Sequence, residues 1–382
     1  MISFPSKQPQ VQTTIFTKMS ALALEHGALN LSQGFPGFDC APALQELLQQ
    51  YAKGHNQYAP MAGVPALRQS LAAKTSSFYD IPVDADTEVT IVSGATEALF
   101  AAIHCCVSPG DEVILFDPSY DAYDPIIRLA GGIPIHIPLK ASNNFAIDWS
   151  SVTAKITPRT RAIMVNSPHN PTGAVWSMAD LDAFAEIVKG TNILIVSDEV
   201  YEHIVFDGAQ HASVLLHPEL RKRSFVCGSF GKTYHITGWK IGYCIAPAFL
   251  TAEFRKLHQW VTFSSATPLQ YALADYLKEP AHYLGLSDFY QKKRDLFASQ
   301  FAGSRWKVLP SAGSFFQCLD YSAISGEKDV DLADCLTREI KVASIPVSVF
   351  YETDPGDKIL RFCFAKEDEV LVEAAKRLIQ IL

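Results

Sequence analysis

The chain has 382 residues, enough for one large domain and a second, smaller one. Its net charge of -8 argues against a nucleic-acid-binding surface, and no apolar run approaches the roughly 18 to 20 residues of a membrane span. Since the N-terminus also lacks the basic start and apolar stretch of a signal peptide, we expect a cytoplasmic protein. The 8 cysteines form no CxxC pair, which is typical of reduced core thiols rather than of a disulfide framework or a zinc site.

The first part of the chain has the pattern of an extended arm over residues 1–40, with one short helix at 19–26. Two further helices are expected, one around Leu44 and one running from 64 to 77. Strands then alternate regularly with helices. The expected strands are 88–92, 112–116, 133–139, 162–166, 193–197, 224–228 and 241–246, and the helices among them are 95–106, 123–130 and 178–188. This alternation predicts an α/β fold with a mostly parallel sheet that is covered on both faces.

The second part of the chain leaves this alternation. Its expected elements are a helical stretch over 249–277 interrupted near Pro268, helices 281–301, 330–340 and 367–381, and strands within 306–321, 342–349 and 359–364. Such a mixture predicts a smaller α+β domain. We therefore expect a large domain over 43–285 and a small domain over 286–382, joined by the N-terminal arm 1–42.

Three polar segments follow predicted strands, at the sheet edge where open α/β sheets bind ligands. The first is Gly94-Ala95-Thr96, a tight turn that opens a helix. Free backbone N–H groups and the helix dipole at such a turn suit a phosphate. An ordinary helix cap formed by Ser93 or Thr96 would explain the same residues.

Asn170 follows the expected strand 162–166, and Asp198 follows the expected strand 193–197. Two X-Pro bonds make the loop 166–173 stiff and could direct the Asn170 amide inward, although a proline-rich surface loop is the alternative. Asp198 ends a very apolar strand, where a carboxylate is desolvated unless it meets a cation or an N–H donor. A protonated pyridine nitrogen would meet that need, and a helix N-cap is the simpler explanation.

The stretch 229–242 contains Ser229, Lys232 and Lys240 among glycines, between two apolar strands. Burial in such a loop can lower the pKa of an amine, so Lys232 could form a Schiff base with an aldehyde cofactor. Ser229 and Lys240 would suit a phosphate, whereas a surface lysine in a glycine-rich turn is the plain alternative. Pyridoxal 5'-phosphate (PLP) carries a phosphate, a ring substituent, a ring nitrogen and an aldehyde. These segments together therefore predict PLP as the cofactor.

Several motifs resemble those of the class I, fold-type-I PLP aminotransferases, and the similarity spans essentially the whole chain. The resemblance is strongest to the kynurenine and methionine aminotransferase subgroup. The motifs are Asn30-Leu31-Ser32-Gln33-Gly34-Phe35-Pro36, Asn56-Gln57-Tyr58, Phe116-Asp117-Pro118-Ser119-Tyr120-Asp121, Asn170-Pro171-Thr172-Gly173, Asp198-Glu199-Val200-Tyr201, Gly231-Lys232-Thr233, Gly238-Trp239-Lys240 and Arg361-Phe362-Cys363-Phe364-Ala365-Lys366.

The resemblance implies a role for each candidate residue. Lys232 would bind the cofactor aldehyde and carry the substrate proton, and Asp198 would pair with the pyridinium nitrogen. The other cofactor-binding residues would be Tyr120 on the ring face, Asn170 and Tyr201 at the 3'-oxygen, and Ala95, Thr96, Ser229 and Lys240 at the phosphate, with Tyr58 from the partner subunit of a homodimer. The substrate would be held by Arg361 at its α-carboxylate and by Gly34, Asn170, Phe16 and Tyr123.

The implied activity is transamination between a neutral apolar or aromatic amino acid and a 2-oxo acid. Donors of the methionine, phenylalanine, tyrosine, kynurenine and glutamine type are expected. A carbon–sulfur β-lyase acting on cysteine conjugates is the alternative on the same scaffold. A regulator built on an aminotransferase-like domain would need a basic helix-turn-helix ahead of it, and only about forty residues with few basic groups precede the expected large domain.

Overall fold

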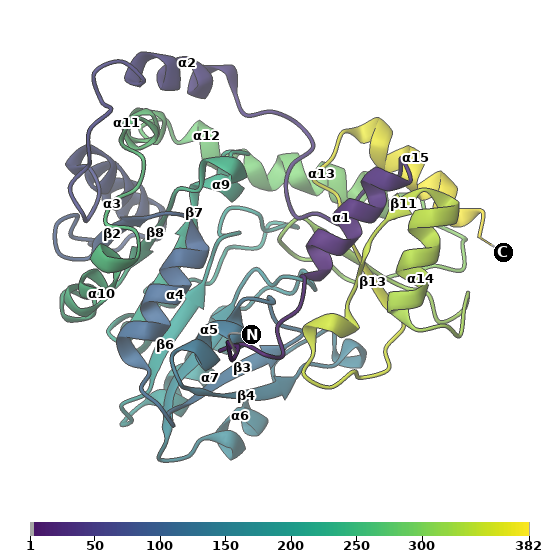
Figure 1. The fold of residues 1–382 in the computed structure, drawn as a ribbon, viewed down its shortest axis with the longest axis horizontal. Coiled ribbons are helices and arrows are strands. Elements are labelled where there is room, and N and C mark those ends of the chain that lie inside the picture. The colour runs from purple at the N-terminus through teal and green to yellow at the C-terminus, as the bar shows by residue number, and fades with distance from the viewer. Residues whose placement is uncertain (1–3, 382) are drawn as a thin grey trace.

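A seven-stranded sheet lies at the centre of the larger lobe in the computed structural model, which describes residues 4–381 (Figure 1). In spatial order its strands are β2 (Val89–Val92), β8 (Gly242–Ile245), β7 (Ser224–Ser229), β6 (Leu194–Asp198), β5 (Thr160–Asn166), β3 (Glu112–Asp117) and β4 (Ile133–Pro138). All pairs are parallel except those of β8, which runs antiparallel to both neighbours. The predicted α/β fold with a mostly parallel sheet is therefore confirmed.

Helices cover both faces of this sheet because its strands are apolar on both sides. Along β6, Ile195 packs in one hydrophobic cluster and the next residue, Val196, packs in the other. Successive strand side chains point to opposite faces, so an unbroken apolar run gives a strand buried on both. The helices of this lobe are α2 (Pro42–Tyr51), α3 (Pro65–Tyr79), α4 (Ala95–Cys106), α5 (Tyr123–Leu129), α6 (Trp149–Lys155), α7 (Met178–Val188), α8 (Pro218–Arg221), α9 (Phe230–Thr233), α10 (Ala248–Val261), α11 (Thr267–Tyr276) and α12 (Ala281–Leu284).

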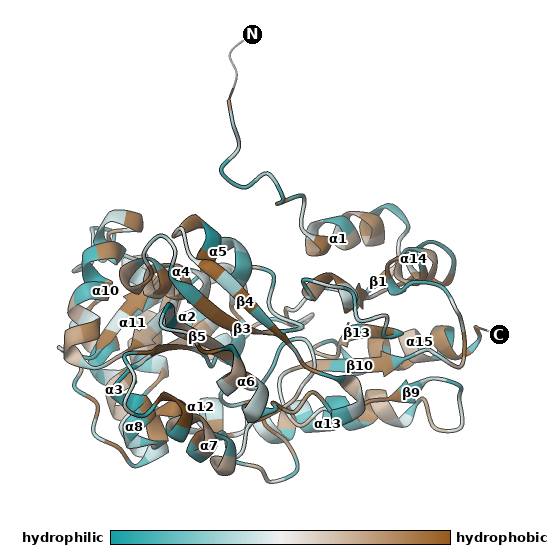
Figure 2. Cartoon of the chain, turned by 90° about the horizontal axis from the view of Figure 1, so that it is seen from below, coloured by the Kyte–Doolittle hydropathy of each residue, from teal (hydrophilic) through white to brown (hydrophobic). Residues whose placement is uncertain are grey.

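The smaller lobe is built from both ends of the described chain (Figure 2). Its antiparallel sheet has the order β12 (Ile345–Pro346), β13 (Ile359–Cys363), β10 (Phe316–Asp320) and β9 (Lys307–Val308). Near the N-terminus, β1 (Leu29–Asn30) pairs in parallel with β11 (Val342–Ala343). The helices are α1 (Ile15–Glu25), α13 (Leu286–Ser299), α14 (Asp329–Cys335) and α15 (Asp368–Ile379). Residues 4–14, ahead of α1, are extended (Figure 2), and Gln8 donates a hydrogen bond to the Pro125 carbonyl oxygen of α5 in the larger lobe at 2.8 Å.

Some elements differ from the sequence-based expectation. The helical stretch 249–277 is two helices, and Pro268 lies in the first turn of α11, where its missing N–H costs no helical hydrogen bond. The expected helix 281–301 divides at Gly285 into α12 and α13. Helix α6 was not predicted, because its seven residues carry too few apolar positions to show a period. No helix of residues 4–381 has the length and apolar character needed to cross a membrane.

Candidate active site

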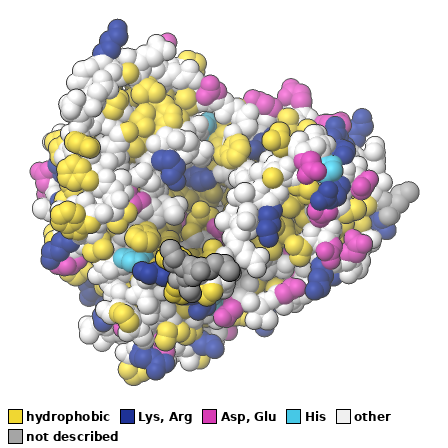
Figure 3. Space-filling model, in the orientation of Figure 1, with side chains coloured by type: hydrophobic (Ala, Val, Ile, Leu, Met, Phe, Trp, Pro, Cys, Tyr) yellow, Lys and Arg dark blue, Asp and Glu magenta, His cyan; other side chains and the backbone are white. Residues whose placement is uncertain are grey.

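Several strands of the large sheet end in polar residues at its carboxyl edge, next to the smaller lobe. Parallel β5, β6 and β7 end at Asn166, Asp198 and Ser229, and a cavity of about 170 Å³ lies beside them. Figure 3 shows a depression between the two lobes with Lys or Arg atoms on its wall. The cavity is lined by Gly94, Ala95, Thr96, Leu99, Tyr120, Asn166, Asn170, Asp198, Val200, Tyr201, Ser229, Gly231, Lys232, Thr237, Lys240 and Ile241.

One end of the cavity has the character of an anion cradle. Gly94 precedes α4 with a φ of +80°, and no side chain caps this helix, neither Ser93 nor Thr96. The N–H groups of Ala95 and Thr96 donate to no acceptor within residues 4–381. A Cβ at Gly94 would lie 3.2 Å from Lys240 Nζ, so the glycine leaves this ammonium group beside the helix N-terminus. Free N–H donors, a helix dipole and a cation together favour a phosphate.

Lys232 lies on α9, directly after β7, and its side chain reaches across the cavity toward the smaller lobe. Its Nζ donates a hydrogen bond to the Gly34 carbonyl oxygen at 2.7 Å. The same nitrogen lies 5.3 Å from the centre of the Phe315 ring and 5.8 Å from that of Tyr201. Burial disfavours the charged amine and lowers the pKa of Lys232 to about 8. A substantial neutral fraction of this amine is therefore present near neutral pH.

Asp198 also lines the cavity, at the end of β6. Burial raises the pKa of its carboxyl group to about 6, and hydrogen bonds from Tyr123 and from the Val200 N–H oppose the rise. Tyr123 Oη donates to Asp198 Oδ2 at 2.7 Å, and the Val200 N–H donates to Oδ1 at 3.3 Å. No helix begins at Asp198, so the N-cap alternative does not hold. The carboxylate faces the cavity with two donors and no cationic partner within residues 4–381.

Tyr123 is placed differently from its expected position in the substrate side-chain pocket. The residue is buried, and its hydroxyl group is hydrogen-bonded to Asp198 instead of lining the cavity. Its position follows from α5, which begins at Tyr123 and packs against the cluster under the sheet edge. The structure thus brings Tyr123 to the carboxylate of the site.

Asn166 is a site residue that was not singled out from the sequence. Its amide nitrogen donates to the Asp198 carbonyl oxygen at 2.8 Å, and its Oδ1 accepts from the Asn170 N–H at 2.7 Å. The side chain therefore ties the proline-rich loop to the end of β6. Its place as the last residue of the predicted strand 162–166 was the available signal, because strand ends of parallel sheets meet at one edge.

Arg361, on β13 of the smaller lobe, is fully buried and forms no ion pair with a carboxylate of residues 4–381. Its two terminal nitrogens donate to Asn170 Oδ1 at 2.8 Å and to the Ser32 carbonyl oxygen at 2.7 Å, while Nε has no partner. The guanidinium lies over the Phe316 ring at 4.0 Å. A buried guanidinium without a counter-ion is costly, so this position favours an anionic ligand.

The remaining predicted residues are Phe16, Gly34 and Tyr120, which lie at the site, and Tyr58, which lies outside it. Phe16 stacks near Arg361, with the guanidinium carbon 5.2 Å from its ring centre. Gly34 lies against the Phe316 ring, which a Cβ would approach to 2.8 Å. Tyr120 lines the cavity, and burial raises its pKa to about 12. Tyr58 is 86% exposed and lies outside the cavity of the single chain.

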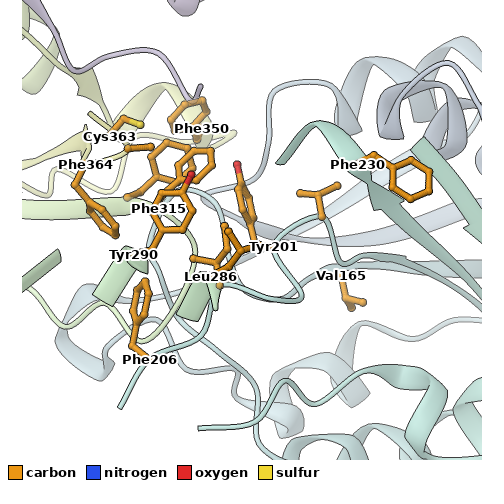
Figure 4. Packing of buried hydrophobic residues seen from close by; sticks show 14 of the residues in the cluster. Val165, Tyr201, Phe206, Phe230, Leu286, Tyr290, Phe315, Phe350, Cys363 and Phe364 are labelled. Carbon is orange, nitrogen blue, oxygen red and sulfur yellow. The ribbon is translucent and has the colours of Figure 1, made fainter. Parts of the chain in front are cut away.

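Tyr201 stands between the lobes, as Figure 4 shows, with the small-lobe aromatic residues on one side and Phe230 on the other. Its ring packs edge-on against Phe315 at 4.9 Å. Burial raises the pKa of this phenol well above its ordinary value, so the hydroxyl group remains a proton donor.

One cavity thus combines a lysine with a lowered pKa, an anion cradle and a buried carboxylate. This arrangement is expected of enzymes that bind a phosphorylated aldehyde cofactor through a lysine. The family model described as "Aminotransferase class I and II" matches residues 27–378, and the chain belongs to this family. It is an aminotransferase.

Relatives match the chain over nearly its full length. It is 52% identical to the methionine aminotransferase of Escherichia coli, with 98% of each chain covered, and a solved E. coli structure identified with that function superposes with a TM-score of 0.97 over 100% of both chains. The structure of N-succinyldiaminopimelate aminotransferase from Mycobacterium tuberculosis gives 0.96 at 38% identity, again over 100% of both chains. A kynurenine–oxoglutarate transaminase of Dictyostelium discoideum is 34% identical, covering 99% of this chain and 96% of its own.

Proposed function

We propose that the chain transfers the amino group of a neutral apolar or aromatic L-amino acid to a 2-oxo acid, with PLP as cofactor. The observation that carries the proposal is a pair of cations at the site, the half-buried Lys232 and the fully buried Arg361, neither of which forms an ion pair with a carboxylate of the described chain. One is suited to an aldehyde and the other to an α-carboxylate.

The residues present fit PLP at each of its polar groups. Lys232 would hold the aldehyde, and Asp198 with its donor Tyr123 would face the ring nitrogen. Asn170 and Tyr201 would hold the 3'-oxygen, and Tyr120 would cover one face of the ring. The phosphate would be bound by Ala95, Thr96, Ser229 and Lys240.

When bound, PLP supplies an electron sink for the negative charge that forms as the substrate Cα loses its proton. Arg361 binds the substrate α-carboxylate and thereby sets the direction of the Cα–H bond. The neutral amine of Lys232 would accept the Cα proton and deliver it to the cofactor carbon that carried the aldehyde, a task for which a pKa near 8 is well matched. Asp198 holds the proton on the ring nitrogen, and the surrounding aromatic side chains exclude water.

An apolar side-chain pocket supports the proposed donor class. The Arg361 guanidinium is surrounded by the rings of Phe16, Phe316 and Phe350, with centres 4.0 to 5.7 Å away. Aromatic and thioether side chains pack well against such rings. The names of two relatives, a methionine aminotransferase and a kynurenine–oxoglutarate transaminase, agree with this chemistry.

The test is a donor panel of methionine, phenylalanine, kynurenine, glutamine and aspartate, followed by the absorption of bound PLP and by formation of the new amino acid. Methionine, phenylalanine or kynurenine is expected to convert the cofactor faster than aspartate, and Lys232→Ala is expected to lower turnover at least about 1,000-fold. Conversion by aspartate alone would contradict the donor class, and full turnover by Lys232→Ala would contradict the catalytic role. Release of pyruvate and thiol from a cysteine conjugate measures the β-lyase alternative.

A homodimer is part of the proposal. The exposed aromatic side chains Tyr58, Trp260 and Phe263 lie on one side of the larger lobe, with the Tyr58 and Phe263 rings 5.5 Å apart. A second copy covering them would remove a large apolar area from water. Tyr58 would then reach the phosphate of the partner subunit.

A further inference from the structure

A buried carboxylate, Glu202, joins three separate segments beneath the active site. Its Oε2 accepts a hydrogen bond from Tyr79 Oη at 2.8 Å, and its Oε1 accepts one from Tyr243 Oη at 2.5 Å. Lys74 Nζ forms an ion pair with the same Oε1. All four side chains are buried, and they come from α3, from β8 and from the loop after β6. We refer to Glu202, Lys74, Tyr79 and Tyr243 as the Glu202 network.

The Glu202 network holds a full ion pair away from water. Burial acts to raise the pKa of Glu202, but Lys74 and the surrounding donors outweigh it and keep the pKa well below its ordinary value. His203 Nε2 also lies 3.3 Å from this carboxylate. A buried pair is tolerated when its remaining lone pairs are satisfied, as they are here, and it then favours one defined arrangement.

Glu202 directly follows Tyr201 in the chain. Tyr201 lines the cavity, whereas Glu202 does not and lies on the other side of the backbone. The residues that follow β6 form turns. Two backbone hydrogen bonds hold these turns, one from the Glu202 N–H to the Glu199 carbonyl and one from the Ile204 N–H to the Tyr201 carbonyl. Such turns leave few backbone hydrogen bonds to hold Tyr201 in place. The Glu202 side chain therefore supplies the anchor that a helix or strand would otherwise provide.

The network also reaches the segment that carries Lys232. Tyr243 pairs with Gly228 across β8 and β7, and its ring lies so close that a Cβ at Gly228 would approach it to 2.1 Å. Ser229 follows at once, and the Phe230 ring lies 5.1 Å from that of Tyr243. One carboxylate thus holds both the Tyr201 turn and the beginning of the lysine segment against α3.

We propose that Glu202 is a positioning residue for transamination, which sets the Tyr201 hydroxyl group relative to Lys232 through the Glu202 network. The proposal rests on the proposed function, in which Tyr201 binds the cofactor 3'-oxygen. Glu202 touches neither cofactor nor substrate. It acts because displacement of Tyr201 changes the hydrogen bond that the 3'-oxygen receives.

The test is a cycle of four proteins, all loaded with PLP: the unsubstituted chain, Glu202→Gln, Tyr201→Phe and the double variant. The readouts are the pH midpoint of the absorption band of bound PLP, the affinity for PLP, and kcat and KM for methionine. Glu112→Gln is the matched control, since Glu112 is an equally buried carboxylate with an arginine partner at the other end of the sheet. Tyr243→Phe is a milder variant that removes one hydrogen bond and leaves the ion pair intact.

Glu202→Gln is expected to shift the pH midpoint by about 1 unit and to lower kcat about 10-fold with little change in KM. In the Tyr201→Phe background the same change is expected to shift the midpoint by less than about 0.3 unit, because coupled residues are not additive. Tyr243→Phe is expected to move the midpoint in the same direction, and Glu112→Gln is expected to leave it unchanged.

A purely structural role would lower the unfolding temperature of Glu202→Gln and of Glu112→Gln without moving either midpoint, and would overturn the proposal. An equal midpoint shift in both Tyr201 backgrounds would also overturn it. If Glu202→Gln does not fold, an unchanged midpoint in Tyr243→Phe decides against the inference. Failure of the proposed function itself is recognised separately, since Tyr201→Phe would then leave the PLP band of the otherwise unsubstituted chain unchanged.

Discussion

Burial shifts the pKa values of two ionisable groups that line the cavity, and in each case it favours the neutral form. The amine of Lys232 has a pKa of about 8 and the carboxyl group of Asp198 a pKa of about 6. Desolvation is the largest cause at both residues. An amine that loses its proton easily and a carboxylate that lacks a cation are both suited to a ligand that bears an aldehyde and a protonated ring nitrogen.

The lowered pKa of Lys232 predicts its reactivity in protein freed of PLP. Only the neutral amine is acetylated, so labelling of Lys232 by acetic anhydride should rise with a midpoint near pH 8. A lysine in a short unstructured reference peptide, labelled in the same mixture, should follow the ordinary midpoint of about 10.4. Peptide mass spectrometry after labelling at several pH values measures both. Equal midpoints for the two lysines would contradict the assignment.

Tyr123→Phe should change the pH dependence of PLP binding. The ionised Asp198 attracts a protonated ring nitrogen, so affinity should fall as the pH drops through about 6. Since the Tyr123 hydrogen bond lowers the pKa of Asp198, its loss should move this midpoint upward by about 1 unit. Fluorescence titration of PLP into the PLP-free protein from pH 5 to 8 gives the midpoint. A downward shift would rule out the assigned hydrogen bond as the cause.

At the scale of secondary-structure elements, the site is formed by strand ends and by one helix N-terminus. Helix α4 follows β2 with only Ser93 and Gly94 between them, so its first N–H groups face the carboxyl edge of the sheet. The apolar runs and the turn glycines predicted this strand, this helix and their junction. The stretch 249–277 forms two helices, but in the sequence both halves show the same helical period. Only the interruption near Pro268 indicated the division.

Gly94→Ala tests the anion cradle. The φ of +80° disfavours alanine, and the added Cβ would lie 3.2 Å from Lys240 Nζ. The variant should lose about 1 to 3 kcal/mol of stability and bind PLP at least about 10-fold more weakly. Gly110→Ala is the control, since Gly110 has a φ of +89° and no atom within 4 Å of its added Cβ. It should lose stability but keep its PLP affinity, as urea unfolding and titration would measure.

The whole molecule brings together residues that are more than 300 positions apart. Arg361 from β13 donates to the carbonyl oxygen of Ser32 and to Oδ1 of Asn170 in the larger lobe. The proposed homodimer is the next level, and it would cover exposed aromatic side chains such as Trp260, which is 83% exposed, and the packed pair Tyr58 and Phe263. An aromatic side chain of this exposure favours an interface.

Trp260→Glu should weaken the proposed homodimer at least about 100-fold, since a charge would replace a large exposed aromatic side chain that the second copy would cover. Val330→Glu, on α14 of the smaller lobe, is the matched control at an exposed apolar position and should leave the dimer intact. Sedimentation velocity over a range of protein concentrations compares the two. An unsubstituted chain that is active and monomeric would remove the need for Tyr58 from a partner.

The sequence by itself determined the order of strands and helices, the residues at the strand ends and the family motifs. Hydrophobic periodicity and turn glycines act over a few neighbouring residues, so they can be read directly from the chain. Only the tertiary structure decided that Tyr123 lies on Asp198, that Asn166 ties two loops together, and that Arg361 is buried without a counter-ion. These contacts join elements far apart in sequence, and their geometry depends on packing that no local pattern encodes.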